Sequence, residues 1–123
     1  MRALAVQRKA EVQTSLLPKV AAVFDLKDEN ERRIFDVIQR YFTDPPGVDN
    51  LHAIHRGVRH TEDGPRRVVW TVSCFQPRRR GAKTEWSIIT WDIDEISMGF
   101  LRCQDQQQAM TLFESLRSEP GNS

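Results

Sequence analysis

The stretch of residues 68–93, VVWTVSCFQPRRRGAKTEWSIITWDI, decides the fold because it reads as two strands joined by a basic loop. Val68–Phe75 alternates along a strand-like run rich in β-branched and aromatic residues, and Trp86–Ile93 has the same character. Between them, Gln76–Lys83 contains a proline, three arginines and a glycine, a composition typical of a turn. The sequence therefore predicts a β-hairpin with a positively charged tip.

Two further strands are predicted on either side of this hairpin. Residues 51–60 precede it and are separated from it by the turn-like segment Glu62–Pro65, and Met98–Cys103 follows it. Short connections between successive strands favour an antiparallel arrangement in which neighbours along the chain are also neighbours in space. We therefore expect a sheet over residues 51–103.

Helical patterns flank the predicted sheet at both ends. Apolar residues recur every three or four positions over residues 3–24, where Pro18 is expected to break or kink the helix. A second helix is expected to begin with a capping box formed by Asp28 and Glu31, and to end before the prolines of Asp44–Gly47. The same type of cap, Asp105 with Gln108, opens a third helix.

The order of these elements defines the predicted fold class, which is α+β. We expect a four-stranded antiparallel meander with two N-terminal helices and one C-terminal helix packed on one face. The opposite face would be partly apolar and open to a partner, which favours a homodimer. We expect a single domain over residues 1–123, with a helical part (1–44), the sheet (51–103), a C-terminal helix (105–117) and a disordered tail (118–123).

The composition is that of an ordinary globular protein. The chain has 123 residues, 39% of them hydrophobic and 28% charged, with a net charge of +1. No apolar run is long enough to cross a membrane, so we expect no membrane partner and a cytoplasmic location. Cys74 and Cys103 are interpreted as reduced thiols, with a disulfide inside one sheet as the alternative.

Positive charge is concentrated in one segment of the chain. Residues 51–83 hold eight basic side chains and two acidic ones, and a field of one sign favours an anionic partner. Arg66 and Arg67 begin a strand whose other end leads to Gln76–Lys83, here called the arginine loop, which would separate the two basic clusters by roughly 30 Å. A separation of this size is better suited to a polymer than to a small molecule.

These features lead to the hypothesis of a non-enzymatic domain that binds nucleic acid through a basic hairpin surface. The basic side chains would contact phosphate, and Trp86 would offer a stacking surface, whereas Trp70 is interpreted as a core residue. The alternatives are docking on an acidic protein surface and homodimerisation through the exposed sheet face. The predicted nucleic-acid-binding residues are Arg66, Arg67, Arg78, Arg79, Arg80, Lys83 and Trp86.

An acidic cluster offers a third hypothesis, a metal-dependent phosphodiesterase. Asp92 and Asp94 would project to the same side of a strand, with Glu95 beside them, and two carboxylates are a common way to hold a divalent metal ion. The sequence contains no glycine-rich phosphate loop, nucleophile elbow or CxxC pair. We therefore expect no cofactor and no enzymatic activity, and the metal hypothesis stays an alternative.

Three histidines lie in the first predicted strand. Regular alternation would put His52 and His60 on one face and His55 on the other. Without a nearby cysteine, this pattern favours an extension of the basic surface over a zinc site.

Overall fold

A computed structural model describes residues 19–43, 50–77 and 79–119 of the chain. The predicted helix before Pro18, the residue Arg78 and the last residues of the predicted tail lie outside these ranges. Residues 19–22 are helical and precede the longer elements. Those elements are α2 (Glu29–Thr43), β1 (Asn50–Thr61), β2 (Gly64–Phe75), β3 (Glu85–Asp92), β4 (Ser97–Cys103) and α3 (Gln106–Arg117).

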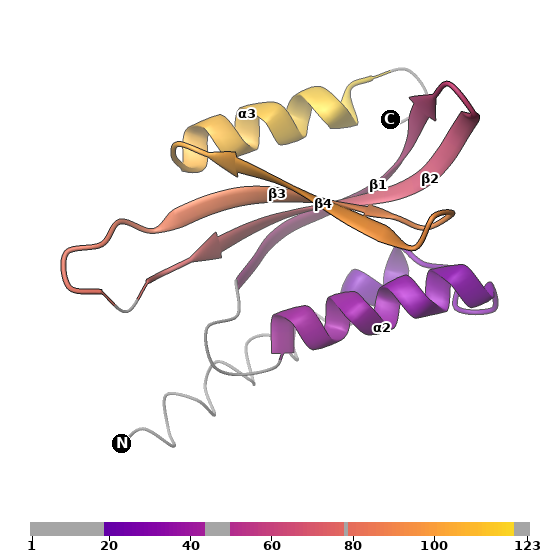
Figure 1. The fold of residues 1–123 in the computed structure, drawn as a ribbon, viewed down its shortest axis with the longest axis horizontal. Coiled ribbons are helices and arrows are strands. Elements are labelled where there is room, and N and C mark those ends of the chain that lie inside the picture. The colour runs from indigo at the N-terminus through magenta and orange to yellow at the C-terminus, as the bar shows by residue number, and fades with distance from the viewer. Residues whose placement is uncertain (1–18, 44–49, 78, 120–123) are drawn as a thin grey trace.

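The four strands form the predicted antiparallel meander, with the order β1-β2-β3-β4. A tight turn joins β1 to β2, and Gly64 follows it at φ +109°, a conformation that favours glycine. The arginine loop joins β2 to β3, so the predicted hairpin is confirmed (Figure 1). In this arrangement β1 and β4 are the two edges of the sheet.

The helices cover both faces of the sheet, so the prediction that all helices pack on one face is wrong. Figure 1 shows α2 on one side of the sheet and α3 on the other. One core joins α2 to the sheet, and a second core joins α3 to the opposite face. The buried sheet residues of the first core are Val69, Ile89 and Trp91, joined by Ile93 of the β3–β4 turn, and those of the second are Val68, Trp70, Val72, Ile88 and Cys103.

Helices cover both faces because the central strands β2 and β3 are apolar on both faces. Both β2 and β3 present large apolar side chains at consecutive positions, such as Val68 and Val69 or Ile88 and Ile89, which are all buried. A strand that is apolar on both faces needs cover on both faces. The C-terminal helix supplies the second cover through Ala109 and Phe113.

Both predicted N-caps are present. The carboxylate of Asp28 accepts a hydrogen bond from the backbone N–H of Glu31 (3.1 Å), and that of Asp105 accepts one from Gln108 N–H (2.8 Å). The capping box of α2 is modified, because the Glu31 carboxylate reaches back to the backbone N–H of Asp25 rather than to that of Asp28. No helix in the described ranges is long and apolar enough to cross a membrane.

Candidate anion-binding site

The loop between β2 and β3 is held in shape by its own polar groups. Gln76 donates through Nε2 to the backbone oxygen of Ala82 (3.1 Å) and accepts a hydrogen bond from the Thr84 hydroxyl. Inside this frame, the N–H of Ala82 donates to the carbonyl of Arg79 (3.0 Å), which closes a turn in which Gly81 has φ +77°. The tip of the loop is therefore an ordered turn that carries basic side chains.

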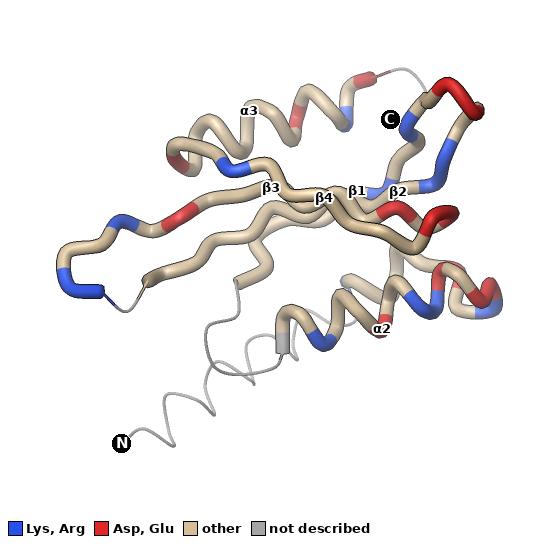
Figure 2. Tube along the Cα trace, in the orientation of Figure 1, with Lys and Arg blue, Asp and Glu red and all other residues tan. Residues whose placement is uncertain are grey.

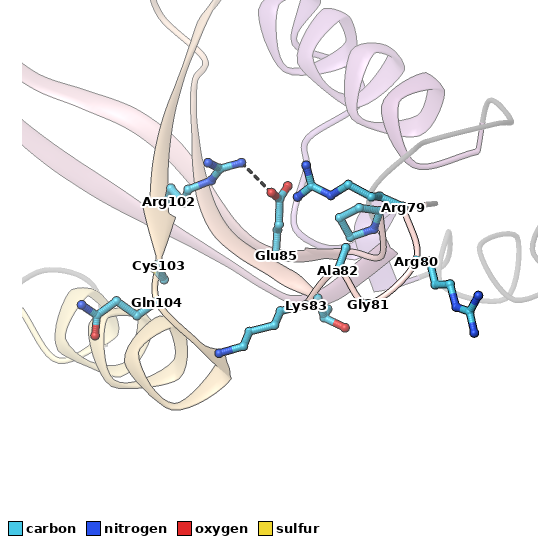
Figure 3. Close-up of a pocket in the computed structure, with 11 residues that line it drawn as sticks. Arg79, Arg80, Gly81, Ala82, Lys83, Glu85, Arg102, Cys103 and Gln104 are labelled. Carbon is cyan, nitrogen blue, oxygen red and sulfur yellow. Dashed lines mark ion pairs between the residues drawn. The ribbon is translucent and has the colours of Figure 1, made fainter.

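Four basic residues, Arg79, Arg80, Lys83 and Arg102, are among those that line a cavity of about 390 Å³ between this loop and the end of β4. Figure 3 shows Arg79 and Arg102 on either side of Glu85, while Lys83 extends toward Gln104 and Arg80 points away from Glu85. Within the described residues, Arg79, Arg80 and Lys83 have no carboxylate within ion-pair distance, although the loop residue Arg78 is outside those ranges. No carboxylate in the described ranges neutralises these three charges.

Glu85 and Arg102 complete the site. Their side chains form an ion pair of 2.9 Å across neighbouring strands, and the Arg102 side chain remains 75% exposed. The residues that line the cavity include four basic groups and one carboxylate. The sequence prediction missed Arg102 because it joins the site only through the pairing of β3 with β4, which places Arg102 opposite Ser87.

The other predicted basic cluster lies at the far end of β2 and is paired within the protein. Arg67 donates to Asp94 through Nε (3.0 Å) and Nη2 (2.7 Å), and also to Glu31 on α2 and to Asp28, which precedes that helix. Arg66 pairs with Glu95, and its guanidinium also lies 3.3 Å from a carboxylate oxygen of Asp63 and 3.7 Å from one of Asp92. In Figure 2 the colour on the loop between β2 and β3 is blue, with red following where β3 begins, whereas blue and red segments are mixed at the opposite end of the sheet.

These pairs also shift the ionisation of the groups involved. The hydrogen bonds from Arg67 hold the pKa of Asp94 below its usual range, and Asp94 in turn raises the pKa of Arg67. Burial alone would raise the pKa of Glu31, but hydrogen bonds from Arg56 and from the Asp25 N–H outweigh it, and the pKa is lowered. Arg67 therefore joins α2, β2 and the β3–β4 turn as a structural cation.

The tryptophans are core residues to different degrees. Trp91 is fully buried on the α2 face, where its Nε1–H donates to the hydroxyl of Thr71 (2.8 Å), and Trp70 is buried under α3, as predicted. Trp86 is half-buried against the α3 core and meets His52 edge-on, with the ring centroids 5.1 Å apart. Its role as a stacking surface for a base stays a prediction, with part of its ring already in contact with protein.

A β-bulge changes the predicted arrangement of the histidines. The pairing of β1 with β2 shifts between Leu51 and Ala53, so the alternation of side chains is broken at His52. His52 and His55 consequently contact Trp86 and Trp70, which both belong to the α3 side of the sheet. The expected opposition of these two histidines is wrong.

The acidic cluster does not converge on one point. Asp92 is paired with Arg66 and Asp94 with Arg67, and the predicted alternation fails because the turn begins at Ile93. In the described part of the chain, no group of three His, Cys, Asp or Glu side chains has the geometry to hold a metal ion.

The two cysteines are free thiols. Both pair with Trp86, Cys74 from β2 and Cys103 from β4, so two strand spacings of about 4.8 Å separate them. A disulfide between them would need a much shorter separation.

Comparison of the chain with known protein families, curated proteins and solved structures gives no match.

Proposed function

We propose that this protein is a non-enzymatic domain that binds nucleic acid through the loop between β2 and β3 and the adjoining end of β4. The observation that supports this most directly is the contrast between the two ends of the sheet. Arginines at one end are bound to carboxylates of the same chain, whereas Arg79, Arg80 and Lys83 line an open cavity with Glu85 as its one acidic residue. Phosphate groups are the ligands that such a site binds without sequence preference.

The geometry narrows the set of residues that would contact phosphate. Arg66 and Arg67 would have to give up intramolecular carboxylates before they could bind an external anion, at a cost in stability. Arg102 takes their place in the proposal, because it extends from the edge strand next to the loop and is mostly exposed. Arg78 remains in the proposed set as a member of the same loop.

The test is a charge reversal of the loop with a matched control. The variant Arg79→Glu/Arg80→Glu/Lys83→Glu is compared with Arg32→Glu/Arg33→Glu/Arg40→Glu, which makes the same change in net charge on the exposed face of α2. Binding to a labelled single-stranded oligonucleotide and to its duplex is followed by fluorescence anisotropy at several salt concentrations. Loss of three phosphate contacts should reduce the slope of log K against log salt by about 2 for the single strand.

The α2 control variant should keep a slope close to that of the wild type. Only the general change in net charge should reduce it. If the loop variant and the α2 variant weaken binding equally, the affinity comes from net charge and the proposed site is wrong.

The same anisotropy experiment with poly-glutamate as competitor tests the alternative partner, an acidic protein surface. Displacement of the oligonucleotide by poly-glutamate at equal charge concentration would favour an acidic protein surface instead.

A further inference from the structure

The edge strand β4 is unusually apolar and exposed. Every residue of β4 except Cys103 is exposed. Of the seven exposed large hydrophobic residues in the described ranges, four lie between Ile96 and Leu101, and the Phe100 and Leu101 residues are 59% and 52% exposed. An edge strand of this kind presents unpaired backbone groups together with apolar side chains, which favours pairing with another strand.

The opposite edge of the sheet provides a contrast within the same molecule. β1 contains a β-bulge, two arginines and three histidines, which are features that discourage pairing with another chain. β4 contains no proline, its pairing with β3 is regular, and Arg102 is its one charged residue. The absence of protection is therefore specific to β4.

We propose that β4 is the interface of a homodimer, in which two copies of the strand pair antiparallel about a two-fold axis through Phe100 and form one eight-stranded sheet. Phe100 is the central residue of the seven in Ser97–Cys103, so this register pairs the whole strand with its copy. An isologous contact of this type closes on itself and forms a dimer rather than a fibre. The proposal does not depend on the proposed nucleic-acid binding.

Side chains in this register are complementary in size. Leu101 would lie opposite Gly99 of the second copy, and a side chain placed at Gly99 would meet no atom within 4 Å. On the other face, the two Phe100 rings would meet at the axis, each already next to Tyr41 of its own chain at a centroid distance of 6.3 Å. Cross-strand pairs of aromatic and apolar residues are what stabilise a sheet.

The same register would bring Arg102 toward acidic residues of the second copy. Antiparallel pairing brings the end of β4 that carries Arg102 alongside the β3–β4 turn of the second copy, where Asp94 and Glu95 lie. Glu95 is half-exposed, so part of its charge is open to a second chain. The two-fold axis makes this contact twice, which favours the antiparallel orientation over a parallel one.

The first test is the mass of the full-length chain in solution, measured by size-exclusion chromatography with light scattering. The wild type should have twice the 14.3 kDa mass of one chain. Phe100→Glu, which places two carboxylates at the axis, should be monomeric with an unchanged circular dichroism spectrum. The control Leu26→Glu alters an exposed apolar residue outside β4 and should remain dimeric. A monomeric wild type, or a dimer unaffected by Phe100→Glu, would overturn the proposal.

A second test checks the register. In a background with Cys74→Ser and Cys103→Ser, the variant Phe100→Cys should form a disulfide-linked dimer on mild oxidation. Directly opposite residues of antiparallel strands have Cα atoms about 4.5–5.5 Å apart, within the range of roughly 4.4–6.8 Å that disulfides require. Leu26→Cys in the same background should cross-link far more slowly. Equal rates for the two variants, or faster cross-linking of Met98→Cys than of Phe100→Cys, would refute this register.

Discussion

The buried carboxylate of Glu31 joins the helical layer to the sheet, and its removal is the perturbation with the clearest expected outcome. The Glu31 side chain is only 4% exposed, and it accepts hydrogen bonds from the backbone N–H of Asp25 (3.0 Å), from Arg56 and from Arg67 (3.0 Å). Arg56 also donates to the carbonyl of Val23 (3.0 Å), so the same cluster anchors the segment before α2. We predict that Glu31→Ala destabilises the fold substantially and that Glu31→Gln does so less.

The size of the effect follows from these contacts. A hydrogen bond to a charged group contributes about 1.5–3 kcal/mol, and Glu31 is the acceptor of several. Both arginines are about one-third exposed, and Arg67 keeps Asp28 and Asp94, so water and these carboxylates offset part of the loss. We expect a loss of about 3 kcal/mol in the free energy of unfolding for Glu31→Ala. Glu31→Gln keeps the shape and one acceptor, and should lose about half as much.

The assay is urea denaturation followed by circular dichroism, with the midpoint and the slope m fitted separately. A loss of 3 kcal/mol should also lower the melting temperature by about 12 °C for a domain of this length. Glu29→Ala is the matched control, because Glu29 forms an exposed pair with Arg33 on the same helix and should cost about 0.5 kcal/mol or less. Should Glu31→Ala prove no more destabilising than Glu29→Ala, the buried network does not hold α2 on the sheet.

Three other predictions address single contacts. Because the pKa of Glu31 is lowered from its ordinary value of 4.5, its charge stabilises the fold above that pH, and the stability is lost as the pH falls. The difference between wild type and Glu31→Gln in urea titrations should therefore shrink below pH 4.5, and a constant difference would contradict this. Asp105→Ala should cost about 1 kcal/mol through loss of the α3 cap, and Asp105→Asn should restore most of it. Trp91→Phe should cost about 2 kcal/mol because it opens space and leaves Thr71 without its donor. In a double-mutant cycle with Thr71→Val, the two costs should be less than additive.

The strands and helices could be predicted from the sequence because their signals are local. Alternation within β2 and β3, the turn composition of Gln76–Lys83 and the caps at Asp28 and Asp105 each depend on residues within a few positions of one another. The position of α3 depends on contacts between distant parts of the chain, and the prediction that α3 packs on the same face as the N-terminal helices was wrong. The signal was nevertheless present, since Val68, Val69 and Trp70 are apolar at consecutive positions and such a strand is buried on both faces.

The candidate site could be predicted only in part, for a related reason. Arg79, Arg80 and Lys83 are found from the loop alone, whereas Arg102 enters through the pairing of strands. Sequence alone could not separate the open arginines from the paired ones. The partners of Arg67 at the start of α2, Glu31 and the capping residue Asp28, are 36 and 39 residues away, and no local pattern connects them to Arg67.

The β4 interface and the arginine loop share Arg102 but otherwise use different residues, and this allows them to be tested separately. Antiparallel pairing reverses the direction of the second copy, so the two loops of a dimer would lie at opposite ends of the eight-stranded sheet. Each loop would then bind a short oligonucleotide by itself. Phe100→Gln removes the apolar contact at the axis without adding charge, and it should lower the mass to that of one chain while the affinity per chain stays at the wild-type value. A parallel loss of mass and affinity would instead mean that the second copy contributes to the anion site, most directly at Arg102, the residue shared by the cavity and the strand.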